Sequence, residues 1–220
     1  MSTTREPRDR AWEREEMVKS QLAARGITEP RLLDAMRRVP REMFVPAGAG
    51  KRAYDDCALE IECDQTISQP YMVGRMTELL DLRPDSRVLE IGAGSGYQTA
   101  ILSHLAGGVY SVEWHLKLML LAFSRLEKLG RRNVVLRCGD GSQGWAEHAP
   151  YDAIIVTAGA PDVPSRLPAQ LSIGGRLIAP VGPRDEQTLV EIRRSAGGFD
   201  RCDGIKCRFV RLRGRGGWAD

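Results

Sequence analysis

The stretch "VLEIGAGSGYQTA", residues 88–100, decides the fold of this 220-residue chain. A short apolar run leads into Gly92, Gly94 and Gly96, and a helix-forming segment follows. Glycines between a strand and a helix allow a sharp turn and let a ligand approach the backbone closely. A dinucleotide site of the G-x-G-x-x-G type would need a third glycine where Tyr97 stands. The loop therefore favours a nucleotide-like ligand without a pyrophosphate.

Short apolar runs and helical segments alternate on the carboxyl side of residue 86. We expect strands at 87–91, 109–112, 134–138, 153–156 and 176–181, with crossover helices at about 97–106 and 116–129. This alternation predicts an α/β fold with a mostly parallel sheet and helices on both faces. The connection from 181 to "TLVEI" (188–192) is too short for a parallel crossover. Antiparallel strands, "TLVEI" and "CRFVRL" (207–212), are therefore expected at the edge of the sheet.

The length and composition are those of one soluble domain. We expect a single domain over residues 1–220, with an N-terminal cap of helices and loops (about 1–82) and a core (about 83–220). No apolar run is long enough to span a membrane, and the amino terminus does not read as an export signal.

Charge and cysteine usage narrow the functional classes. The net charge of +3 is too small to argue for a nucleic-acid partner. The five cysteines are odd in number and form no close pair, which favours reduced thiols in the cytoplasm. The three histidines are scattered, so we expect no metal site. Nothing in the sequence demands a partner chain, and a monomer is expected.

Acidic residues near three strand ends sharpen the expected ligand. Glu90 precedes the glycine loop, Glu113 ends the second strand, and Asp140 follows the third. The carboxyl ends of parallel strands meet at one edge of a sheet, where open α/β sheets bind ligands. An acid there can accept hydrogen bonds from ribose hydroxyls, from an adenine amino group or from an ammonium group. We therefore predict a site for S-adenosyl-L-methionine (SAM).

Several segments resemble the protein-L-isoaspartate O-methyltransferase family, in that family's order. They include "RVPREMFVP", "AYDDCAL", "QTISQPYMVGRMTELL", "VLEIGAGSGYQTAIL", "VYSVE", "APYDAIIVTAGAP" and "GGRLIAPVG". The resemblance implies a Rossmann-like SAM-dependent methyltransferase sandwich. It also implies methyl transfer from SAM to the α-carboxyl of L-isoaspartyl residues in damaged proteins, giving a methyl ester and S-adenosylhomocysteine.

The resemblance also assigns the site. Ser68 is the expected active-site serine, in a loop whose Gln65, Thr66, Ile67 and Tyr71 form the same wall. The remaining cofactor-binding residues are expected to be Glu90, Gly92, Gly94, Ser95, Gly96, Glu113, Asp140 and Gly141.

The acidic row "EIECD" departs from the family, which has small residues there. If residues 60–64 are extended, Glu60, Glu62 and Asp64 point the same way. We expect this row to face water. Facing the substrate, it would repel a carboxylate, so two alternatives stay open. One is a SAM-dependent methyltransferase with a different carboxylate acceptor, and the other is a non-catalytic SAM-binding paralogue.

Overall fold

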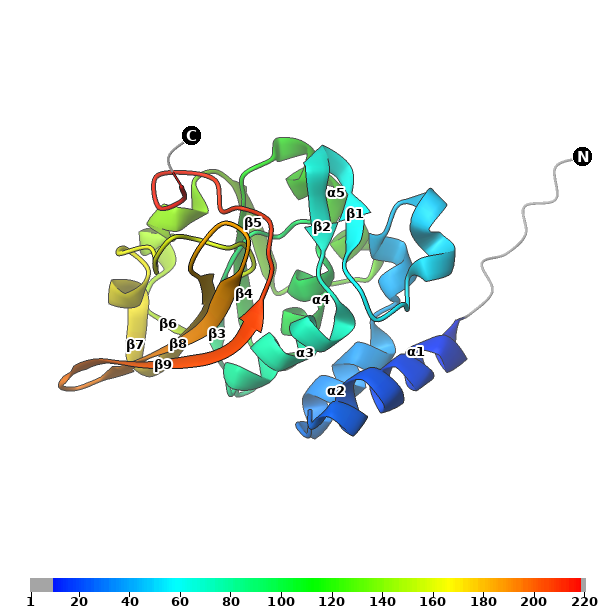
Figure 1. Ribbon diagram of the computed structural model, residues 1–220, viewed down its shortest axis with the longest axis horizontal. Helices are drawn as coiled ribbons and strands as arrows, with labels where there is room; N and C mark the ends of the chain where they lie inside the picture. Colours follow the sequence, from blue (N-terminus) through cyan, green and yellow to red (C-terminus); the bar gives the residue numbers. More distant parts are fainter. Residues whose placement is uncertain (1–9, 219–220) are drawn as a thin grey trace, which may run out of the picture.

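The computed structural model describes residues 10–218, and its centre is a seven-stranded sheet (Figure 1). The strand order is β5-β4-β3-β6-β7-β8-β9. The pairs among β5, β4, β3, β6 and β7 are parallel, whereas β8 and β9 are antiparallel to their neighbours. The strands are β3 (Arg87–Ile91), β4 (Gly108–Glu113), β5 (Val134–Cys138), β6 (Tyr151–Val156), β7 (Leu171–Val181), β8 (Gln187–Ser195) and β9 (Gly198–Cys207). The expected mixed sheet is confirmed.

The last strand was predicted in the wrong place. β8 and β9 form a hairpin with a tight turn between Ser195 and Gly198, so β9 pairs from Gly198 onward. "CRFVRL" was expected to be this strand, but β9 ends at Cys207. The segment that follows runs back beside the loop after β6, where the Leu212 N–H donates to the Gly159 carbonyl oxygen at 2.7 Å.

The two faces of the sheet are covered differently. Side chains of Val88 and Ile155 pack against Leu102 of α4 and Met76 of α3. The opposite face is covered by residues 139–150 and 157–170, whose helices are short 3₁₀ turns. The helices are α3 (Pro70–Leu79), α4 (Tyr97–Leu105), α5 (Leu116–Lys128), η6 (Gly141–Gln143), η7 (Ala146–His148) and η8 (Pro168–Gln170).

The N-terminal elements pack beside the helical face, at the blue and cyan side of Figure 1. Buried Leu22, Leu32 and Phe44 share one apolar cluster with Tyr97 of α4 and Leu118 of α5. The elements are α1 (Ala11–Met17), the π-helix η1 (Val18–Leu22), η2 (Ala23–Arg25), α2 (Pro30–Arg38), η3 (Arg41–Phe44), η4 (Ala47–Arg52), β1 (Leu59–Ile61), η5 (Glu62–Asp64) and β2 (Gln65–Ile67). These N-terminal elements thus share one apolar core with α4 and α5. The expected division into a cap and a core over residues 1–220 stays a prediction, and residues 1–9 and 219–220 lie outside the described residues.

The acidic row is not extended, which corrects the geometry expected for it. β1 and β2 form an antiparallel hairpin, and the 3₁₀ turn η5 joins them. Cys63 and Asp64 take the left-handed conformation, with φ of 61° and 56°. Non-glycine residues adopt this conformation at a cost of about 1–2 kcal/mol. Because of the turn, the three carboxylates do not point one way, and Glu60 and Asp64 are exposed to solvent.

Candidate functional site

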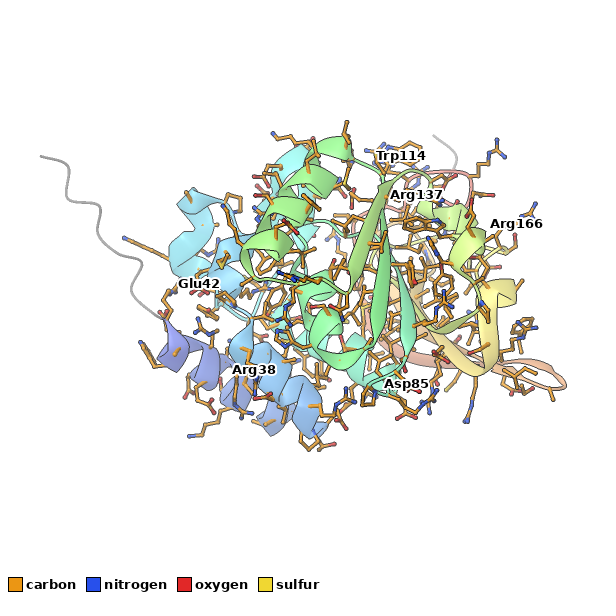
Figure 2. All side chains as sticks on the ribbon, turned by 180° about the vertical axis from the view of Figure 1, so that it is seen from behind. Arg38, Glu42, Asp85, Trp114, Arg137 and Arg166 are labelled. Atoms are coloured by element: carbon orange, nitrogen blue, oxygen red, sulfur yellow. The ribbon has the colours of Figure 1, made fainter. Side chains whose placement is uncertain are left out.

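A cavity opens at the carboxyl ends of β3, β4 and β6 and encloses about 830 Å³, part of it open to solvent. Figure 2 labels Trp114, which follows β4 and lines the cavity, at one end of the sheet, and Asp85, which precedes β3, at the other. Four chain segments contribute most of the wall. They are residues 65–68 of the β2 region, 91–98 around the glycine loop, 112–115 after β4, and 210–213 after β9, joined by Val73, Met76, Gly141, Thr157 and Ala158.

The glycine loop needs its glycines for both conformation and space. Gly92 and Gly94 have φ of 98° and 53°, in the region that favours glycine. A Cβ on Gly92 would lie 2.5 Å from the Thr157 hydroxyl. That hydroxyl donates to the carbonyl oxygens of Ile91 and Gly92, at 2.9 and 2.6 Å. The loop backbone is therefore fixed from behind and faces the cavity without side chains.

Glu113 joins the second strand to this loop. One carboxylate oxygen accepts from the Gly94 N–H at 2.8 Å, and the other accepts from the His115 N–H at 2.9 Å. The side chain is nearly buried, and it lines the cavity. Each carboxylate oxygen can accept more than one hydrogen bond. Glu113 can therefore hold the loop and still accept from the two hydroxyls of a ribose.

Arg125 of α5 fastens the same loop from the other side. Its Nη1 donates to the Ser95 carbonyl oxygen at 3.0 Å. Burial lowers the pKa of Arg125, and the nearby Glu62 carboxylate opposes that shift. Glu62 therefore lies toward α5, and none of Glu60, Glu62 and Asp64 lines the cavity.

Ser68 lines the cavity together with Gln65, Thr66 and Ile67. The N-cap of α3 is Gln69, which makes no capping hydrogen bond through its side chain. Within residues 10–218, the Ser68 hydroxyl has no hydrogen-bond partner, whereas its carbonyl oxygen accepts from Arg41 at 2.8 Å. The backbone of Ser68 is thus held while its side chain faces the cavity.

Four of the expected cofactor-binding residues do not line the cavity: Tyr71, Glu90, Gly96 and Asp140. The Tyr71 ring lies under the Arg25 guanidinium, 3.6 Å from ring centroid to carbon. Gly96 is the N-cap of α4 and lies against Ala122 of α5.

Asp140 holds the C-terminal segment. One of its oxygens accepts from the backbone and hydroxyl of Ser142, at 3.0 and 2.6 Å, and the other accepts from the Arg215 N–H at 3.0 Å. The Gly216 N–H in turn donates to the Ser142 hydroxyl at 2.9 Å. These contacts keep the segment after β9 beside the cavity.

Glu90 lies beneath the cavity floor, on the α4 side of β3. Its Oε2 accepts from the hydroxyls of Thr99 and Ser111, both at 2.6 Å, while its Oε1 is buried without a partner. Burial raises the pKa of Glu90 to about 7, and the two hydroxyl hydrogen bonds oppose that shift. Glu90 therefore joins β3, β4 and α4.

Sequence reasoning missed some of the lining. Thr157 follows β6 just as Glu113 ends β4, so the strand-end rule applied there could have found it. Val210 and Leu212 come from a segment interpreted as a strand, Arg213 follows that segment directly, and no local signal brings the three to the cavity.

SAM fits this cavity on two observations. Side chains are excluded where the backbone must approach: a Cβ on Gly141 would lie 2.5 Å from Ile91 Cγ2, as one on Gly92 would clash with Thr157. Glu113 lies at the end of the second strand, and its carboxylate oxygens could also accept from ribose hydroxyls beside the two backbone N–H groups that they already bind. Within residues 10–218, no group of three or more His, Cys, Asp or Glu side chains could hold a metal ion.

The mostly parallel sheet, the glycine loop and the acid at the end of the second strand define a SAM-dependent methyltransferase. The family model described as protein-L-isoaspartate(D-aspartate) O-methyltransferase matches residues 12–217. This chain belongs to that family, whose members are protein carboxyl methyltransferases with SAM as co-substrate.

Known relatives are similar in sequence to this chain along nearly its whole length. Protein-L-isoaspartate O-methyltransferase 2 of Geotalea uraniireducens is 53% identical over 207 residues, covering 94% of this chain and 95% of the relative. The protein of that family from Geobacter metallireducens is 52% identical over 206 residues, covering 93% and 95%.

Two solved structures are also similar. A protein-L-isoaspartate O-methyltransferase superposes with a TM-score of 0.84 at 32% identity, covering 93% of this chain and 67% of that one. A Plasmodium falciparum protein described as a methyltransferase of this type, in complex with S-adenosyl-L-homocysteine (SAH), superposes with a TM-score of 0.80 at 25% identity. The match covers 91% of this chain and 98% of that one.

The buried Glu90 generates a prediction about stability and pH. Its pKa is raised in the folded state, so folding favours the protonated form. Its contribution is therefore fully present below about pH 4.5 and is lost as pH rises through about 7. Glu90→Gln removes this titration, so the stability of the wild type relative to the variant should fall by on the order of 3 kcal/mol between pH 4.5 and 8. Urea denaturation of both proteins across this range measures the difference, and parallel profiles would contradict it.

Proposed function

We propose that the protein transfers the methyl group of SAM to the α-carboxyl of L-isoaspartyl residues in damaged proteins, giving the methyl ester and SAH. The observation that carries this proposal is that Ser68 and Thr66 line the same cavity as the glycine loop and Glu113. A loop with hydroxyl groups and a nucleotide-type loop thus share one cavity. Membership of the family supports the same substrate class.

The reaction needs little acid–base chemistry from the chain. A carboxylate is already ionised at pH 7, so it can act as the nucleophile without a general base. Bound SAM supplies the electrophilic methyl group on its sulfonium. The chain's task is to hold the carboxylate in line with that group and to exclude water. We propose that the Ser68 hydroxyl donates to one carboxylate oxygen while the other attacks, and that Thr66 and Gln65 shape the same wall.

We assign the donor side of the cavity to the other lining residues. Gly92, Gly94, Ser95 and Gly141 bring backbone to the co-substrate, and Glu113 accepts from its ribose. Glu90 and Asp140 support the site from outside it, as their hydrogen bonds indicate. Because Glu60, Glu62 and Asp64 do not line the cavity, the acidic row does not oppose a carboxylate acceptor there.

The proposal predicts that the protein labels a short isoaspartyl peptide with a base-labile methyl group and leaves the same peptide with normal aspartate unlabelled. Ser68→Ala should lower kcat/KM for the isoaspartyl peptide by roughly tenfold or more, because a hydrogen bond to a charged group is lost. Its affinity for SAH should stay unchanged. Radiolabelled methyl transfer and calorimetry measure the two quantities.

The matched control is Ser124→Ala, which removes an exposed hydroxyl from α5 and should leave both quantities alone. No labelling of either peptide by a wild type that binds SAH would overturn the proposed function. An equal loss of kcat/KM in Ser68→Ala and Ser124→Ala would overturn the role proposed for Ser68.

We also propose that the protein works as a cytoplasmic monomer without a nucleic-acid partner. Its five free cysteines, two of them exposed, suit a reducing compartment. Within residues 10–218, no helix has the length and apolar character needed to cross a membrane. Light scattering on the purified protein should give one chain mass of 24.4 kDa, and twice that mass would contradict a monomer.

A further inference from the structure

Arg41 is a buried cation directly behind the wall that carries Ser68. Its side chain is fully buried, with 0% exposure. Nε donates to the Ala53 carbonyl oxygen and Nη2 donates to the Ser68 carbonyl oxygen, both at 2.8 Å. The guanidinium carbon lies 4.9 Å from the centre of the Tyr97 ring. Its remaining nitrogen, Nη1, is buried without a partner.

This cation has no counter-ion in the described part of the chain. Between residues 10 and 218, no carboxylate forms an ion pair with Arg41. Glu42, the next residue along the chain and labelled in Figure 2, instead pairs with Arg14 at 3.2 Å and accepts from the Tyr54 hydroxyl. Burial lowers the pKa of Arg41, yet a guanidinium remains protonated in proteins. An uncompensated buried charge is costly, and two carbonyl groups and one ring only partly offset that cost.

Both Ser68 and Tyr97 line the cavity, whereas Arg41 does not. The guanidinium thus lies one residue behind the wall, next to the place proposed for the acceptor. A carboxylate that enters beside Ser68 is attracted through a region of low dielectric, where the attraction is strong. It makes no direct ion pair with Arg41, so its oxygen lone pairs stay free to attack the methyl group.

We propose that Arg41 is a positioning residue that makes the acceptor end of the cavity select a negatively charged group, while its hydrogen bond fixes the peptide unit of Ser68. This inference rests on the proposed function. The buried arginine acts on the acceptor by fixing the backbone of Ser68 and through the electrostatic field of its guanidinium. It therefore provides charge selection without quenching the nucleophile.

Arg211 and Arg213 offer a competing source of positive charge, since they also line the cavity. Both are exposed to solvent. Salt screens exposed charges strongly and buried charges much less. The two sources can therefore be separated by ionic strength, without any substitution.

The test compares two peptides that differ only in charge: an isoaspartyl peptide and the same peptide with an α-carboxamide. Their dissociation constants are measured by calorimetry on the protein saturated with SAH. The wild type should prefer the carboxylate, and Arg41→Gln should reduce that preference by about tenfold. The variant's affinity for SAH should change by less than about threefold, because SAH does not depend on this charge.

The matched control is Arg25→Gln, which removes another arginine that covers a tyrosine ring near the start of α3. Arg25 is exposed and already paired with Asp56, so this variant should keep the preference for the carboxylate. If Arg41→Gln weakens the binding of both peptides equally, Arg41 has only a structural role and the proposal is wrong.

A measurement on the wild type keeps the proposal testable even if Arg41→Gln fails to fold. The preference for the carboxylate should persist between about 50 and 500 mM NaCl, because the buried charge is poorly screened. Loss of the preference at high salt would assign it to the exposed arginines and overturn the proposal. Failure of the proposed function looks different: it is the absence of methyl transfer by the wild type, which these binding ratios do not measure.

Discussion

The site depends on the Glu113 carboxylate and the two backbone N–H groups that it accepts from, those of Gly94 and His115. The backbone of a glycine-rich loop is flexible because glycine has no side chain. Ordering such a loop on binding costs conformational entropy, so contacts that order it beforehand favour ligand binding. Glu113 removes it by joining the loop to the end of β4. Thr157 and Arg125 add restraints from β6 and α5. The cavity floor is thus preorganised by residues from three strand ends and one helix.

The proposed acceptor side of the cavity is held in place by packing of the N-terminal elements. Residues 65–68 belong to a small hairpin of the N-terminal cap, and they reach the cavity because β1, η5 and β2 pack on α4 and α5. Arg41 ties this wall to the neighbouring loop at Ala53. The sheet therefore presents the proposed donor site, and the N-terminal elements carry the proposed acceptor wall. The fixed relation between them is what an in-line transfer requires.

Prediction from the sequence succeeded where the structure is determined by residues close together in the chain. The strands at 87–91 and 134–138 have the expected bounds, and the crossover helices end within one residue of expectation. Gly92, Gly94 and Glu113 line the cavity because each stands at a strand end. Ser68 came from the family resemblance, since its loop is brought to the site by tertiary packing.

Other residues depend on contacts that are distant in sequence or on strand geometry. Asp140 binds the backbone of Arg215, and no local pattern records that contact. Glu90 was expected in the cofactor site, but it shares its face of β3 with Val88, which packs against α4. Alternation along a strand therefore places Glu90 under α4 and outside the cavity. "CRFVRL" failed as a strand because the tight turn after β8 places the pairing residues earlier in the chain.

The most direct test of this account is the affinity of Glu113→Gln for SAH, measured by calorimetry beside Glu127→Gln, an exposed glutamate of α5. The amide cannot accept from both Gly94 and His115, since one of its two polar atoms is a donor. The account predicts that Glu113→Gln binds SAH about 10- to 100-fold more weakly while Glu127→Gln binds as the wild type does. Unchanged affinity in Glu113→Gln would show that the loop is ordered without this carboxylate and would contradict the account.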